Sequence, residues 1–504
     1  MSSIAGTWRR GRAQIRSASP RADDDAMVAA GLIYALLAVL VWVIQSELGV
    51  RTPWPVASVT GMFAVHLLLI RRSLNDPVVI FVIVMFMYSY LPAIADISAP
   101  GSTLGFDLAL AYDLFNVGQI ATMVGVAISC SFMRRNGPPP VLSPVDSTAC
   151  LVGGIVSGIL AIMLISAAIA ARGFVLGGSV SYGESFTQQT EAGNGIYMLC
   201  IPFCLASIGL ILASRHPLSG YVLAIPVFCF IEIAVGIGQR KYFIQPALFI
   251  FAFYWTSRRF YQTVAIIAAA LFGFLFFCYL GFLRINALGI EALLSPAEWA
   301  NFFSELGVYV GSETVYLYAT AASAVAGFIR PLDYGGDYLM AWALSFPRFL
   351  MTDALAELYT SANDRFSYAY DVLAADFGQG YGFSFLGESY LVGGLPATAL
   401  MVIVQVCLFR YAYLRGGGNR PTGVWGAISL LSLYFAMWTQ RNALGVIIRE
   451  FIVFAIGAVV AMYYAGHITS RIVLPTMAKI HRDTKRSQEA AAASAHAEPT
   501  RILH

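Results

Sequence analysis

Charged residues are scarce in this sequence. Asp, Glu, Lys and Arg make up 12% of the residues and hydrophobic types 58%, whereas an average soluble domain has roughly 25% charged residues. Runs of about 20 apolar residues recur along the chain, and each is long enough to cross a hydrocarbon core of about 30 Å. This scarcity excludes a soluble globular protein and predicts an all-α, polytopic membrane protein with the lipid bilayer around it.

Short motifs that would indicate other chemistry are also missing. The chain has no Walker A sequence and no dinucleotide fingerprint, which argues against ATP-driven work by this chain alone. Its seven cysteines form no C-x-x-C pair and fall in or near apolar runs, where we expect them to act as small packing residues. We expect no cofactor, no metal ion and no nucleic-acid partner.

The apolar runs predict twelve transmembrane helices. The eighth is short, and the tenth begins with a polar, glycine-rich turn. The predicted spans are roughly residues 26–46, 55–71, 77–95, 112–132, 149–171, 195–214, 218–237, 242–257, 260–282, 383–409, 423–439 and 446–466.

Lys and Arg in short connections set the predicted orientation, because these cations favour the cytoplasmic side. The N-terminal arm, residues 1–25, carries five arginines and is placed in the cytoplasm, and alternation places the partly disordered tail, 467–504, there too. Between them we expect nine helices over 26–282, a large periplasmic loop with short helices over 283–382, and three helices over 383–466. The predicted location is the bacterial inner membrane.

Histidine is missing from the predicted outer side. The chain has six histidines, and the topology places all of them in the cytoplasm or in the inner half of a span. This excludes a Ser–His–Asp arrangement and a histidine-ligated zinc site on the outer face. The polar groups that remain there are arginine, lysine, carboxylates and tyrosines.

Some cations nevertheless fall on the outer side, where the insertion bias disfavours them, whereas Arg410 counts among the inner ones. Ionisable groups in such places suggest a functional site, and Arg and Lys suit phosphate oxygens. Each could instead pair with a carboxylate or extend to lipid headgroups; Glu232, two turns before the first of them, is one such partner. The candidates are Arg240 and Lys241 in GQRK, Arg441 in TQRN, and, as weaker members, Arg284 and Arg348.

Glu388 is the candidate carboxylate. It lies in GFSFLGESYLVGGLP at the start of the tenth span, among Gly387, Gly393 and Gly394. Glycines allow another backbone to approach closely, and a carboxylate at membrane depth needs a partner or a proton. A carboxylate here could act as a general base towards a sugar hydroxyl.

The segment 283–382 is rich in tyrosine and tryptophan. Its stretch PAEWANFFSELGVYVG predicts a helix with Pro296 in the first turn. Tyr and Trp rings offer flat faces for sugars, although the same residues populate membrane interfaces routinely. A long loop with its own structure is typical of a lid or binding element.

Two of these stretches resemble elements of the Wzy-type oligosaccharide repeat-unit polymerases, the O-antigen and exopolysaccharide polymerase family. GIGQRK after an apolar helix resembles the family's G-x-R element. FSFLGESYLVGGLPA resembles its S-x-x-G-E-x-Y element, with Leu391 and Val392 where members often have Asn and Phe. The span count and the single large outer loop agree with this family.

The resemblance implies a GT-C-type glycosyltransferase that uses undecaprenyl-pyrophosphate-linked oligosaccharides. Such an enzyme transfers a growing chain from its lipid pyrophosphate to the sugar hydroxyl of a new lipid-linked unit. Arg240 matches the motif arginine and Glu388 the motif glutamate. A chain-length regulator and a flippase are candidate partners.

Three other interpretations remain open at this stage. An O-antigen-ligase-like enzyme would use the same donor but typically carries a histidine in the outer loop, which this chain lacks. A flippase or secondary transporter would be expected to show internal repeats and ionisable residues at the membrane midplane. A structural subunit of an export complex is the third.

Overall fold

The computed structural model describes a bundle of long helices. Every regular element in the described part of the chain is a helix. The predicted span 242–257 lies outside the described residues, so the count of twelve spans stays a prediction. The structure describes residues 20–50, 52–71, 75–94, 106–133, 142–172, 194–237, 290–329, 362–370, 382–440 and 453–471, with isolated positions at 272–288, 331, 447 and 448.

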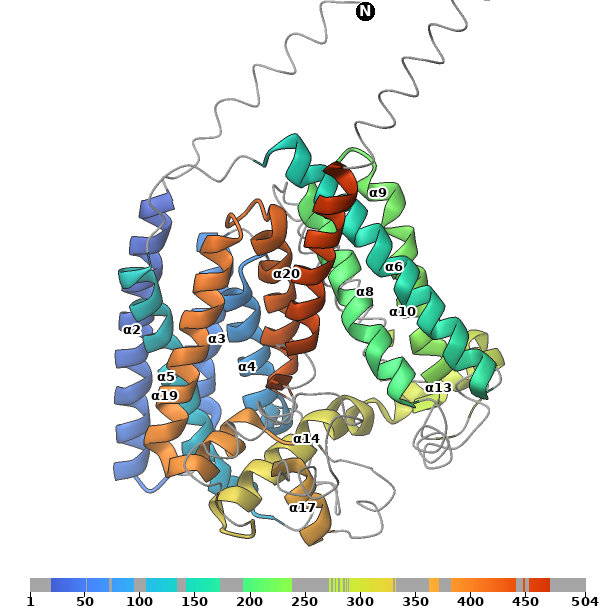
Figure 1. Ribbon diagram of the computed structural model, residues 1–504. Helices are drawn as coiled ribbons and strands as arrows, with labels where there is room; N and C mark the ends of the chain where they lie inside the picture. Colours follow the sequence, from blue (N-terminus) through green and yellow to red (C-terminus); the bar gives the residue numbers. More distant parts are fainter. Residues whose placement is uncertain are drawn as a thin grey trace, which may run out of the picture.

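The long helices form two groups, and the second slants away from the first towards α13 (Figure 1). The first group is α2 (Pro20–Glu47), α3 (Trp54–Arg71), α4 (Pro77–Ile94), α5 (Tyr112–Phe132), α19 (Phe385–Arg415) and α20 (Gly423–Trp438). The second is α6 (Pro144–Arg172), α8 (Asn194–Ser214), the short α9 (Ser219–Val222) and α10 (Ala224–Ile237). Helix α20 joins the groups, because it packs against α4 and α19 on one side and α8 and α6 on the other.

Nine of the predicted spans coincide with these helices, and the described residues of the last span, 446–466, are helical from residue 454. The predicted span 260–282 lies largely outside the described residues. Among the described residues, four helices are long and apolar enough to cross a membrane, and several shorter apolar helices accompany them. Six of the seven cysteines are buried and all are free thiols, as expected for packing residues. These apolar helices therefore support the prediction of a polytopic membrane protein.

Further helices lie at one end of the bundle, away from Pro20, where α2 begins (Figure 1). We call this the outer end, following the predicted topology, and the opposite end the inner end. The outer elements are η1 (Leu108–Ala111), η2 (Ile290–Leu294), α13 (Pro296–Ser304), α14 (Leu306–Val325) and α17 (Ala362–Tyr370).

The segment around Pro296 folds as its sequence indicates, but α14 is longer than the short helices expected there. The Ser295 side chain caps α13 by accepting a hydrogen bond from the Glu298 amide, and Pro296 opens the helix. Non-helical φ and ψ at Glu305 separate α13 from α14, which then runs for 20 residues. Helix α14 packs against α4, α19 and η1, so this part of the predicted loop is joined to the membrane bundle.

Candidate functional site

Glu388 lies in the first turn of α19, at the outer end. Ser384 precedes the helix in an extended conformation, and its carbonyl accepts a hydrogen bond of 2.9 Å from the Glu388 amide. The residue is only 1% exposed. A carboxylate in the first turn of a helix also faces the positive end of the helix dipole, which stabilises its charge.

Two close contacts fix the turn that carries Glu388. A Cβ atom at Gly387 would lie 3.0 Å from the Cα of Ala321 in α14 and 3.3 Å from the Phe383 ring. On the other side, a Cβ atom at Gly118 of α5 would lie 2.7 Å from the Leu386 side chain. The start of α19 therefore packs closely against α14 on one side and α5 on the other. This confirms the close approach expected at Gly387.

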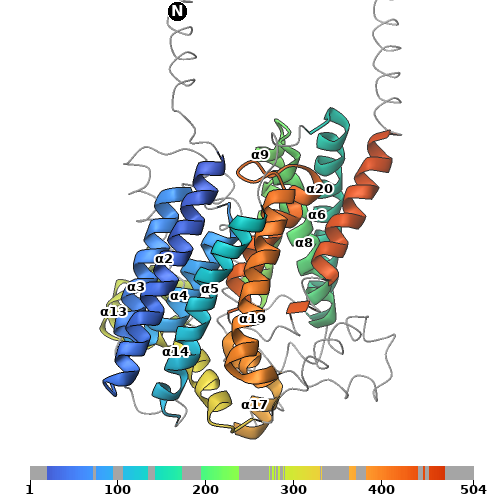
Figure 2. The ribbon, with the colours of Figure 1, turned by 90° about the vertical axis from the view of Figure 1, so that its left-hand side faces the viewer.

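Helix α19 is broken shortly after Glu388, and the chain changes direction there (Figure 2). Gly394 has φ +69° and ψ −159°, a region of backbone conformation that is essentially restricted to glycine. Pro396 follows, and Thr398 Oγ1 donates a hydrogen bond of 3.1 Å to the Gly394 carbonyl. The break divides α19 into a short outer part with Glu388 and a long inner part.

Gly394→Ala is expected to lower the melting temperature of the purified protein, because a Cβ atom forces strain of about 1–3 kcal/mol at this φ and ψ. Gly220→Ala is the matched control, since Gly220 is helical and a Cβ there meets no atom within 4 Å. Equal melting temperatures for the two variants would contradict the strained break.

A hydrogen-bonded polar wall lies beside this turn, where α4, α5 and α14 meet. Tyr90 donates to Asn116 Oδ1 over 3.0 Å, and Gln119 Nε2 donates to Ser89 Oγ over 2.9 Å. Both pairs are buried. Polar side chains inside a helix bundle in lipid need hydrogen-bonding partners, and these side chains provide them for one another.

Tyr318 of α14 packs against the same wall. Its ring stacks on Phe115 with centroids 4.2 Å apart. Burial, and then the neighbouring Tyr90 and Tyr112, raise the pKa of the Tyr318 hydroxyl well above its usual value. A hydroxyl with a raised pKa stays protonated at neutral pH, which makes Tyr318 a poor general base.

The structure describes few of the predicted outer cations. Five candidate phosphate-binding residues lie outside the described residues, and so does the side chain of Glu232, whose position is within α10. Arg365 of α17, another outer arginine, is described and is partly exposed. The five candidates that lie outside are Arg240, Lys241, Arg284, Arg348 and Arg441.

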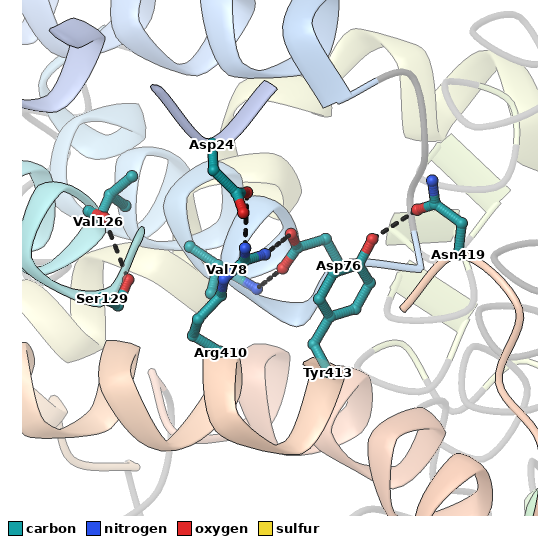
Figure 3. Close-up of polar contacts among 8 residues, drawn as sticks. All are labelled: Asp24, Asp76, Val78, Val126, Ser129, Arg410, Tyr413 and Asn419. Atoms are coloured by element: carbon teal, nitrogen blue, oxygen red, sulfur yellow. Dashed lines mark hydrogen bonds and ion pairs between the residues drawn. The ribbon is translucent and has the colours of Figure 1, made fainter. Parts of the chain in front are cut away.

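A second polar cluster, at the inner end, was missed by the sequence prediction. The guanidinium of Arg410 lies between Asp24 of α2 and Asp76, which precedes α4 (Figure 3). One guanidinium nitrogen is 2.6 Å from Asp24 Oδ1, and the other is 3.6 Å from Asp76 Oδ2. All three residues are buried, so Arg410 is not one of the loop cations with which the topology grouped it.

This cluster connects three elements that are far apart in the sequence. Asp76 also caps α4, because its Oδ1 accepts a hydrogen bond of 3.0 Å from the Val78 amide, and Pro77 opens the helix. Next to the cluster, the Tyr413 hydroxyl hydrogen-bonds Asn419 in the connection to α20. The signal in the sequence is an arginine inside the apolar run LFRYAYL, which requires a buried partner.

A comparison with protein families identifies the family of this chain. The family described as O-antigen polysaccharide polymerase Wzy matches residues 145–469, which is more than half of the 504 residues. No curated protein and no solved structure matches the sequence significantly. The matched region begins in α6 and includes α14, Glu388 and Arg410.

Proposed function

Since this chain belongs to the O-antigen polysaccharide polymerase Wzy family, we propose that it joins undecaprenyl-pyrophosphate-linked oligosaccharide units into O-antigen or exopolysaccharide. The family makes it a bacterial membrane protein and a glycosyl-transferring enzyme that acts on a lipid-linked oligosaccharide. The family match over 145–469 is the observation that carries the proposal. We place the reaction at the periplasmic face of a multi-pass inner-membrane protein with both termini in the cytoplasm.

The proposed reaction exchanges one glycosidic partner for another. A hydroxyl oxygen of the new lipid-linked unit attacks the anomeric carbon of the growing chain, and the bond from that carbon to the pyrophosphate oxygen breaks. Glu388 takes the proton of the attacking hydroxyl as general base. The undecaprenyl pyrophosphate leaves with the electron pair of the broken bond. The position of Glu388 at the outer end, in a turn fixed on both sides, supports this role.

The leaving pyrophosphate gains negative charge as the bond breaks, so cations placed around it stabilise the transition state. We assign this role to the outer cations of the sequence, with Arg240 in the first place. Arginine offers a planar fork that contacts two phosphate oxygens at once, and lysine adds a point charge. The supporting members are Lys241, Arg284, Arg348 and Arg441.

Deletion of the gene followed by analysis of carrier-linked and surface glycans tests the proposal. We expect single repeat units on the carrier and their transfer as single units to the final acceptor. Polymer of normal length in the deletion strain would overturn the proposal. Polymer that stays on the carrier would indicate a ligase, and units trapped in the cytoplasm would indicate a flippase. A chain-length regulator and a separate flippase are the partners we propose.

Arg240→Ala is expected to reduce polymer formation about 100- to 1,000-fold, the usual loss when one preorganised donor to a developing anion is removed. The protein should still accumulate in the membrane. Arg240→Lys should restore activity only in part, because a point charge does not reproduce the forked contact. The measurement is polymer length and amount, with the protein level determined in the same membranes.

Two controls separate this role from a structural one. If Arg240 only pairs with Glu232, the single variant should lower the protein level, and Arg240→Ala combined with Glu232→Ala should restore it. Lys241→Ala should be milder than Arg240→Ala if both lie on one helix, because successive helical residues point about 100° apart. Normal polymer from a well-expressed Arg240→Ala variant would refute the pyrophosphate role.

A further inference from the structure

An aromatic cluster lies at the outer end, near the turn that carries Glu388. Tyr370 of α17 stacks on Phe366 with centroids 5.4 Å apart and planes 9° apart. Phe106 lies 6.4 Å from Tyr370 and meets the Phe328 ring edge-on at 5.2 Å. We call Phe106, Phe328 and Tyr370, which surround Phe366, the aromatic platform.

The platform packs against a buried core and is also accessible. Phe366 is fully buried in a small hydrophobic core with Phe383 and Leu391, so the rings around it are held in place. Tyr370 nevertheless remains 38% exposed and Phe328 43% exposed. Because the rings come from three separate segments of the chain, the fold assembles this surface from parts that the sequence keeps apart.

One side chain connects the platform to the candidate catalytic turn. The Phe383 ring lies 6.4 Å from Phe366, with the two planes at 60°. The same ring is 3.3 Å from the position that a Cβ atom of Gly387 would take. Glu388 directly follows Gly387, so the platform lies next to the turn on which the proposed chemistry depends.

Polar groups flank the exposed rings. Arg365 directly precedes Phe366 and is partly exposed, and Asp107 directly follows Phe106 and is exposed. The Asp107 carboxylate accepts a hydrogen bond of 2.9 Å from the Ala109 amide and keeps further acceptor capacity. The sequence of α17, ANDRFSYAY, is also far more polar than that of the long helices, which argues against burial of this face in lipid.

We propose that the aromatic platform is a sugar-binding subsite, which holds one ring of the oligosaccharide next to Glu388. The faces of Phe328 and Tyr370 would cover the apolar C–H face of a sugar, while Arg365 and Asp107 bond its hydroxyls. This assignment rests on the proposed function, which requires an oligosaccharide to be held near the reacting hydroxyl.

The test is binding of free oligosaccharide to the purified full-length protein in lipid nanodiscs. The probe is the repeat-unit oligosaccharide released from the glycan of the same strain, without pyrophosphate or lipid, so that no transfer occurs during the titration. Tyr370→Leu and Phe328→Leu keep an apolar side chain but remove the ring, and each should raise the Kd about 3- to 10-fold, as expected for one ring contact. Tyr370→Phe keeps the ring and should bind nearly as the unchanged protein does.

Tyr368→Leu is the matched control, because Tyr368 is a 51% exposed aromatic of the same helix. It lies two residues from Phe366 and from Tyr370, on the opposite face of α17, and its loss should leave the Kd unchanged. Melting temperatures show which variants are folded, and Phe328→Leu carries the test if Tyr370→Leu is not.

The outcomes distinguish failure of the subsite proposal from failure of the proposed function. If the unchanged protein binds and both ring-removing variants bind equally well, the subsite is overturned while polymerisation stands. If the unchanged protein does not bind and the deletion strain makes single units, the subsite is again overturned and the function stands. If the deletion strain makes normal polymer, the proposed function fails whatever the titration gives. Weaker binding by both ring-removing variants, with Tyr368→Leu unchanged, supports the subsite.

Discussion

Glu388→Gln is expected to reduce polymer formation about 100- to 10,000-fold, the range usually lost with a general base. The amide has nearly the same shape as the carboxylate but does not accept the proton of the attacking hydroxyl. The turn should keep its place, because Gly387 against Ala321 and Leu386 against Gly118 fix it independently of the carboxylate. The measurement is polymer length and amount in a strain whose own gene is deleted and replaced by the variant.

Glu305→Gln provides the control for this change. Glu305 is an exposed glutamate at the outer end, between α13 and α14, and the same substitution there should leave polymer formation unchanged. The Glu388→Gln protein must accumulate to a normal level with a normal melting temperature. A mild effect on polymer from such a folded variant would show that Glu388 is not the base and serves only as a hydrogen-bonding group.

Local features of the fold follow from the sequence more readily than its contacts do. The apolar runs predict the long helices, because a chain in lipid satisfies its backbone by forming hydrogen bonds within each helix. The start of α13 at Pro296 and the close approach at Gly387 are likewise local and were predicted. The break at Gly394 was anticipated only as a glycine-rich turn, since its φ and ψ depend on how both parts of α19 pack.

Contacts between distant segments could not be predicted in this way. Asp24 and Arg410 are separated by 386 positions in the sequence. Counting the Lys and Arg residues of the loops does not distinguish a buried arginine from a solvated one. The aromatic platform is likewise drawn from three segments, so no periodicity in one of them indicates it. The outer cations remain a prediction from sequence, because Arg240 and its companions lie outside the described residues.

Helix α19 links the outer and inner polar sites. Glu388 and Arg410 are 22 positions apart in this helix, on either side of the break at Gly394. Glu388 lies at the outer end of the bundle and Arg410 at the inner end, so the long inner part of the helix separates the two sites. Arg410 holds the long inner part of α19 against α2 and the start of α4. The outer part, with Glu388, is connected to this inner part.

Arg410→Gln is expected to destabilise the protein by about 3–5 kcal/mol, the usual cost of removing one partner from a buried ion pair. The change leaves the carboxylates of Asp24 and Asp76 buried without the guanidinium between them. The measured results should be a low protein level in the membrane and a lower melting temperature. Arg415→Gln is the control: it removes an exposed arginine from the last turn of the same helix and should have little effect.

The charges of the cluster predict an order among further variants. Asp24→Asn removes one of the two carboxylates and keeps Arg410 beside Asp76, whereas Arg410→Gln removes the guanidinium from between both carboxylates. Asp24→Asn should therefore be milder than Arg410→Gln. Adding Asp24→Asn and Asp76→Asn to Arg410→Gln removes all three charges that form these ion pairs and should recover part of the stability, because asparagine at 76 still caps α4. An Arg410→Gln protein as stable as the Arg415→Gln protein would show that the cluster does not hold α19 in place.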